Sequence, residues 1–169
     1  MDMKTKFFKT GFIFIVAVIA LLGTTSAVSA DYKSMQGIQS TDTVFDFRIS
    51  DPATALAHLG LIHDMKSDPN LVINDSQPDI VLVFIGPSVK LISTDRSDFD
   101  QQDRETLNKL ADKITSMSQD GIKFEVCMVA AHSANVDPDT ILPEINEVYN
   151  GWISLIGYQN NGYALIANF

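Results

Sequence analysis

The stretch Ile80-Val81-Leu82-Val83-Phe84-Ile85-Gly86-Pro87 decides the fold. Apolar residues, four of them β-branched, follow one another from 80 to 85 without a polar side chain, and Gly86-Pro87 ends the run. A strand with one solvated face alternates apolar and polar residues, whereas a strand in the middle of a parallel sheet is apolar on both faces. Residues 80–85 are therefore predicted to form a central parallel strand covered by helices on both sides.

Helices and strands alternate on both sides of this stretch. Asp51 as N-cap and Pro52 at the first helical position predict a helix that ends near Lys66. A second helix is predicted from the apolar spacing at 107–117, followed by Gly121. The remaining predicted elements are strands at 44–49, 122–126, 147–149 and 163–166 and helices at 128–135 and 152–158. The alternation of apolar and polar residues in 44–49 indicates at least one solvated face. The order predicts an α/β three-layer sandwich with a mostly parallel five-stranded sheet.

Residues 1–30 have the pattern of an export signal. Three lysines precede an uncharged apolar run at 12–22, and Val28-Ser29-Ala30 places small residues where a signal peptidase cleaves. The rival interpretation, a retained membrane anchor, needs about 20 apolar residues, and this run has about half that length. We expect an exported protein, periplasmic or secreted, without a stable membrane span after cleavage. The expected divisions are a signal at 1–30, a loose N-terminal arm at 31–43 and a single domain at 44–169.

The charge balance excludes some partners. The 169 residues carry 12 basic and 21 acidic side chains, a formal net charge of −9. Removing residues 1–30 takes away three lysines and one aspartate, which leaves 9 basic and 20 acidic residues, a net charge of −11 over 139 residues. Nucleic-acid recognition depends on cationic contacts to phosphate. We therefore expect no nucleic-acid partner.

Cys127, the only cysteine, comes at the end of a predicted strand with a short helix behind it. A thiol at a helix N-terminus is stabilised as thiolate by the helix dipole and by unpaired N–H groups, which makes it a candidate nucleophile. Cysteine is also among the residues most often fully buried, and position alone favours an inert core residue. His132, five residues further on, is a candidate neighbouring base, although this spacing does not establish a Cys-His dyad. Both interpretations of Cys127 stay open.

A second candidate site follows the central strand. Ligands of open α/β sheets bind outside the carboxyl ends of the strands, so Gly86, Ser88 and Lys90 are candidates for binding a small ligand. The alternative is that Gly86-Pro87 only ends the strand. No metal site or other cofactor is predicted, because His58 and His63 fall on different helix faces and the acidic segment 95–105 lacks the glycine of a calcium loop. That segment is predicted to be a solvated loop and helix start.

Three segments together resemble the DsrE/DsrF-like family: Gly121-Ile-Lys-Phe-Glu-Val-Cys-Met-Val-Ala-Ala131, residues 80–92, and Trp152 to Ala167. The resemblance covers about residues 44–167. It implies a DsrE-like sandwich of the flavodoxin- or Rossmann-like type and assembly into homotrimers or homohexamers. In sulfur-relay members a persulfide forms on the cysteine of a Cys-Val-Ala-Ala-Ala motif, and Cys127-Met-Val-Ala-Ala131 is similar to that motif.

The resemblance implies an exported sulfur or persulfide carrier, or a sulfurtransferase-type component, that acts through Cys127 with a sulfur donor or acceptor protein. Relay members continue the motif with an Arg-Arg-Gly stretch and are cytoplasmic, whereas this chain continues with His132-Ser-Ala-Asn135 and is predicted to be exported. The alternative is a non-catalytic oligomeric module of the same fold that binds a small ligand or a protein near Gly86 and Cys127. Burial of the Cys127 sulfur against apolar side chains would favour the inert-core interpretation.

Overall fold

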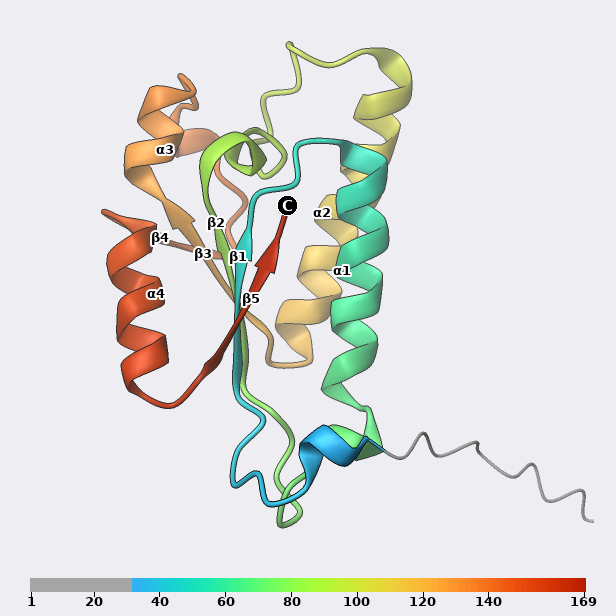
Figure 1. Ribbon diagram of the computed structural model, residues 1–169. Coiled ribbons are helices and arrows are strands. Elements are labelled where there is room, and N and C mark those ends of the chain that lie inside the picture. Colours follow the sequence, from blue (N-terminus) through green and yellow to red (C-terminus); the bar gives the residue numbers. More distant parts are fainter. Residues whose placement is uncertain (1–31) are drawn as a thin grey trace, which may run out of the picture. The chain divides into compact units, whose positions relative to one another are not determined.

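The computed structural model describes residues 32–169, and the predicted export signal at 1–30 lies outside the described residues (Figure 1). Five strands form one sheet in the order β4-β3-β2-β1-β5, and every neighbouring pair is parallel. The bounds are β1 Thr43–Phe47, β2 Ile80–Phe84, β3 Lys123–Cys127, β4 Ile145–Val148 and β5 Ala164–Asn168. The predicted α/β class is confirmed, and β2, from the apolar run, is the middle strand.

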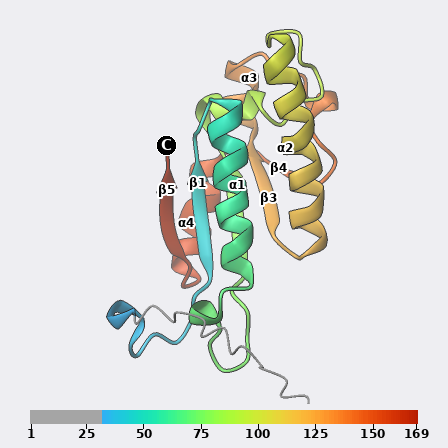
Figure 2. The same cartoon turned by 90° about the vertical axis from the view of Figure 1, so that its right-hand side faces the viewer.

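Helices cover the sheet on both faces. α1 (Pro52–Lys66) and α2 (Gln101–Gln119) lie side by side on one face, as Figure 2 shows, and α4 (Gly151–Asn160) covers the other face. The short α3 (Met128–Ser133) packs against η3, the 3-10 turn Gly86–Lys90, beyond the carboxyl end of the sheet. The other 3-10 turns are η1 Lys33–Met35, η2 Pro69–Leu71 and η4 Pro138–Thr140. None of the helices within residues 32–169 combines the length and the apolar character that crossing a membrane requires.

Local sequence signals explain where the two long helices begin. Asp51 caps α1, since its Oδ2 accepts a hydrogen bond of 2.7 Å from the Thr54 N–H. α2 starts at Gln101, inside the segment 95–105 that is predicted to hold the helix start, because Asp100 accepts a hydrogen bond from the Asp103 N–H at 2.9 Å and begins a polar first turn before the apolar spacing at 107–117. Apolar spacing cannot detect such a turn. α2 is followed by Gly121, as predicted, with φ at +83° in the left-handed region that favours glycine.

The core has two layers, one on each face of the sheet. On the side of α1 and α2, the rings of Phe47, Phe84 and Phe124 lie in a row, with centroids 5.1 and 6.3 Å apart. On the side of α4 the layer is smaller and consists of Val44, Val81, Val83, Ile85, Cys127 and Leu155. Cys127 therefore faces α4.

The expectation of a solvated face on the first strand is wrong. All five residues of β1 are buried, and even Asp46 is only 8% exposed. The reason is that α4 packs over the face that carries Val44 and Asp46, while β5 pairs with the free edge of β1 and makes it an internal strand. Asp46 offsets the cost of burial through an ion pair with Arg48 Nε at 2.8 Å.

The strand begins at Thr43, the last residue of the expected N-terminal arm. Just before it, Thr41 Oγ1 donates a hydrogen bond of 2.5 Å to the carbonyl oxygen of Leu71. The end of the arm is therefore attached to the domain.

Candidate functional site

Cys127 is the last residue of β3 and the N-cap of α3, and its residue exposure is only 4%. The first residue of α4, Gly151, lies directly against it. A Cβ at position 151 would come within 3.0 Å of Cys127 Cβ and 2.9 Å of Ile85 Cγ1 and Cδ1. Only glycine allows the helix to approach the sheet this closely. The thiol is therefore covered by the first turn of α4.

The structure does not bring His132 and Cys127 together as a dyad. His132 is exposed on α3, whereas Cys127 is buried between β3 and α4. Within residues 32–169 no hydrogen bond joins the two side chains, and the Cys127 side chain accepts no capping hydrogen bond from the backbone of α3. A base acting on the thiol would therefore have to come from elsewhere, or His132 would have to move.

The three candidates at the end of β2 have separate roles. Gly86 opens η3 with φ at +66°. Ser88 is fully buried, and its Oγ donates hydrogen bonds to the carbonyl oxygens of Phe47 at 2.7 Å and Ile85 at 3.1 Å. Lys90 extends away from the turn, and its ammonium group pairs with Asp98 Oδ2 at 2.7 Å. Ser88 therefore fastens the turn to β1, and among the three only Lys90 reaches a pocket.

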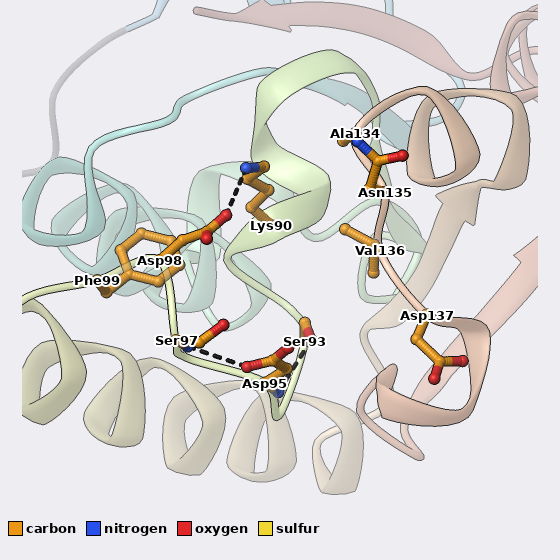
Figure 3. A pocket seen from close by; sticks show the side chains of 10 residues that line it. All are labelled: Lys90, Ser93, Asp95, Ser97, Asp98, Phe99, Ala134, Asn135, Val136 and Asp137. Atoms are coloured by element: carbon orange, nitrogen blue, oxygen red, sulfur yellow. Dashed lines mark hydrogen bonds and ion pairs between the residues drawn. The ribbon is translucent and has the colours of Figure 1, made fainter.

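That pocket has a volume of about 290 Å³ (Figure 3). Two segments far apart in the sequence line it, residues 90–99 and residues 134–137. Its polar lining includes the Lys90 ammonium group, the carboxylates of Asp95, Asp98 and Asp137, and Asn135, Ser93 and Ser97. The Ser97 N–H donates to Asp95 Oδ1 at 2.9 Å, and this bond lowers the pKa of that carboxyl below its ordinary value. The arrangement offers both signs of charge and several hydroxyl or amide groups to a small polar ligand.

The sequence identified Lys90 but not the pocket. The acidic segment 95–105 does form a loop and helix start, and two of its carboxylates belong to the lining. The other wall follows α3, where Asn135 has φ at +56° in the left-handed region and turns the chain back toward the loop. Nothing in the local sequence joins these two segments.

A hydrogen-bond network that sequence reasoning missed connects α4 to the sheet. Glu125 on β3 is buried, and both carboxylate oxygens accept hydroxyl hydrogen bonds: Oε1 from Tyr158 at 2.7 Å, and Oε2 from Ser154. Burial, and then the bond to Glu125, raise the pKa of Tyr158 above its ordinary value. The available signal was a single glutamate inside an otherwise apolar strand.

A second carboxylate lies beside this network. Asp79 Oδ2 accepts hydrogen bonds from Tyr163 at 2.8 Å and from the Lys123 ammonium group at 2.5 Å. The Tyr163 ring meets that of Tyr158 edge-on, with centroids 5.0 Å apart. Burial and the bond to Asp79 raise the pKa of Tyr163 to about 12. Both tyrosines therefore remain protonated donors at neutral pH.

The histidines on α1 have structural partners. His58 Nδ1 lies 2.9 Å from Asn168 Oδ1, and His63 bridges Asp120 and Lys113 at 2.6 and 3.1 Å. Within residues 32–169 no three His, Cys, Asp or Glu side chains are grouped so that they could hold a metal ion. The described residues therefore offer polar binding groups and one covered thiol.

Comparisons with known proteins agree with this fold. One solved structure that is similar is the protein of unknown function MTH1491 from Methanobacterium thermoautotrophicum, with a TM-score of 0.59, 16% identity and coverage of 76% of this chain and 99% of that one. Another is the conserved protein of unknown function BT1422 from Bacteroides thetaiotaomicron, with a TM-score of 0.53, 21% identity and coverage of 75% and 93%. A third is the ychN protein of E. coli, with a TM-score of 0.50, 9% identity and coverage of 76% and 99%. At these identities the likeness concerns the fold alone.

The sequence comparisons identify the family. A search of curated proteins gives no match. The model of the DsrE/DsrF-like family matches residues 48–167, a range that includes most of the chain, the Cys127 segment and all of α4. The chain belongs to the DsrE/DsrF-like family.

Proposed function

We propose that this protein is an exported, homo-oligomeric binding module that holds a small polar ligand in the pocket at Lys90 and does not use Cys127 for catalysis. The observation that carries the proposal is the contrast between the two candidate sites. The pocket is open and lined by charged and polar groups, whereas the thiol is 4% exposed and covered by Gly151. A ligand can therefore enter the first site without any change of the fold.

The outer surface of α4 supports the oligomeric part of the proposal. Trp152, Ile153 and Ile156 point away from the sheet and are 60%, 64% and 58% exposed. Beside α4, the edge strand β5 exposes Leu165, which is in register with Val44 on the α4 face of the sheet. Contiguous exposed apolar residues mark interaction surfaces, and an edge strand has unpaired backbone groups. The occupant we propose is a second copy of the chain, because the resemblance noted above implies homo-oligomers and burial of this face removes apolar area from water.

The binding proposal is tested by a thermal-shift screen of small polar compounds against the purified protein. We expect the stabilising effect of a true ligand to be lost in Lys90→Ala and kept in Cys127→Ser. The pair is a matched test, because Lys90 lines the pocket and Cys127 does not. Binding that is lost in Cys127→Ser and kept in Lys90→Ala would contradict the proposal.

A persulfide carrier is the second candidate function, and the position of Cys127 favours it. The thiol stands at the carboxyl end of β3, where α3 begins, in a segment similar to the motif of the relay members. In this reaction the Cys127 thiolate attacks the outer sulfur of thiosulfate, a bond forms between the two sulfurs, and sulfite leaves. Intact-mass spectrometry after incubation with thiosulfate tests it. A gain of one sulfur atom that is absent in Cys127→Ser supports a carrier, and an unchanged mass supports the binding module.

A further inference from the structure

We propose that α4 is a lid over Cys127, fastened by Glu125, and that the thiol becomes reactive when this helix lifts while the rest of the domain stays folded. The inference goes beyond the binding function proposed above, because it concerns a residue outside the Lys90 pocket. The lid is also independent of whether Cys127 carries sulfur, because it concerns only when a reagent can reach the thiol.

The first support is the contact between the helix and the thiol. Gly151 begins α4 directly over Cys127 and Ile85, with no space for even a methyl group. Leu155, one turn later, is buried in the same apolar layer as Cys127. Removing α4 from the sheet would therefore uncover the thiol, whereas α1 and α2 lie on the opposite face.

The second support is that α4 buries little of itself. Of its ten residues only Gly151 and Leu155 are buried, whereas α2 buries four large side chains on the opposite face, Leu107, Leu110, Ile114 and Met117. The large apolar residues of α4 point outward instead. Segments with few buried apolar contacts open at a lower free energy than the whole domain. Within one protomer, α4 is therefore held to the sheet by few apolar contacts, and in the homo-oligomer proposed above it lifts only when its outer face is released from the second copy.

The third support is the pair of hydrogen bonds that holds α4 to β3. Ser154 and Tyr158 are four residues apart and so share one side of the helix. Both donate to the carboxylate of Glu125, which lies two residues before Cys127 on the same face of β3. Hydrogen bonds to a charged group are stronger than those between neutral groups. The Glu125 carboxylate therefore compensates for the sparse apolar contact and determines how often the helix lifts.

The connections at both ends of α4 permit such a movement. At the start, Asn150 caps the helix with its Oδ1, which accepts from the Trp152 N–H at 3.0 Å. At the end, Gly162 has φ at +91° and turns the chain into β5. Hinges are commonly a few residues at the ends of elements. β5 can therefore remain paired with β1 while α4 moves.

The test is the rate at which iodoacetamide alkylates Cys127 in the purified protein, followed by intact mass at increasing low concentrations of urea. We expect slow alkylation of the native protein. The alkylation rate should change little with urea concentration as long as that concentration stays well below the global unfolding transition. Tyr158→Phe keeps the ring and removes one bond to Glu125. It should raise the native rate at least about tenfold, the factor that corresponds to about 1.4 kcal/mol. Gly151→Ala should also raise it, because the added Cβ displaces the first turn of α4.

Tyr163→Phe is the matched control. It removes a hydroxyl of the same kind from the adjacent ring, but that hydroxyl bonds to Asp79 rather than Glu125. Its alkylation rate should equal that of the wild type within about twofold. Equal rates for Tyr158→Phe and Tyr163→Phe would overturn the proposal. So would rates that follow global unfolding in urea, or a wild-type thiol that reacts as fast as the unfolded chain. None of these outcomes bears on the Lys90 pocket, which its own variants test.

Discussion

The hydroxyl of Tyr158 on α4 donates a 2.7 Å hydrogen bond to Oε1 of Glu125 on β3. This contact joins the helix to the strand that ends in Cys127, on the face of the sheet where the apolar layer is small. Removing the hydroxyl donors from a buried carboxylate leaves it poorly solvated, which is costly. The position of α4, and with it the cover over the thiol, therefore depends on a polar contact as much as on apolar packing.

The first prediction concerns alkaline pH. Tyr163 has its pKa raised from 10.0 to about 12, and the pKa of Tyr158 is raised as well. Because the unfolded chain releases these protons at lower pH than the folded one, their contribution to stability is complete below pH 10 and is lost as the pH rises toward 12. The free energy of unfolding in urea, measured from about pH 9 upward, should fall less steeply in Tyr163→Phe than in the wild type. Identical slopes would contradict the assignment.

The second prediction concerns the aromatic row of the larger core layer. Phe84 is fully buried between Phe47 and Phe124. Phe84→Ala should lower the free energy of unfolding by about 3 to 5 kcal/mol, because it leaves a cavity that the sheet cannot close. Urea denaturation measures the loss. Leu61→Ala, at a position that is 64% exposed on α1, serves as the control and should stay within about 0.5 kcal/mol of the wild type.

The third prediction separates structure from binding in the turn after β2. Ser88→Ala removes a buried hydroxyl with two carbonyl partners and should cost about 1 kcal/mol of stability, with ligand binding unchanged. Lys90→Ala breaks only a partly exposed ion pair and should cost less than about 1 kcal/mol while abolishing binding. Denaturation and thermal-shift binding on the two variants check both halves. A Ser88 variant that folds normally but no longer binds would assign Ser88 to the ligand.

The fourth prediction concerns assembly through the outer face of α4. The double substitution Trp152→Glu with Ile156→Glu places two charges on this face and should convert the proposed homo-oligomer into monomers. Size-exclusion chromatography with light scattering measures the mass. Leu61→Glu introduces a charge on the opposite side of the sheet and should leave the mass unchanged. A wild-type monomer, or an oligomer that survives the double substitution, would refute this interface.

Several elements could be predicted because their causes are local. Asp51 and Pro52 start α1 through a side-chain cap and a preset φ, both of which need only neighbouring residues. The apolar run 80–85 required burial on both faces and so the middle of the sheet. The first strand could not be assigned in the same way, because its second face is covered by α4, which is more than a hundred residues away.

By itself, the sequence determined the α/β class, the order of the elements and the family, since periodicity, caps and family segments are all read along the chain. Only the tertiary structure decided what surrounds Cys127. Gly151 and Tyr158 come to β3 through the crossover between β4 and β5, and the pocket at Lys90 is completed by residues 134–137 in the same nonlocal way. Burial and hydrogen bonding are properties of neighbours in space, and for these residues the neighbours are distant in sequence.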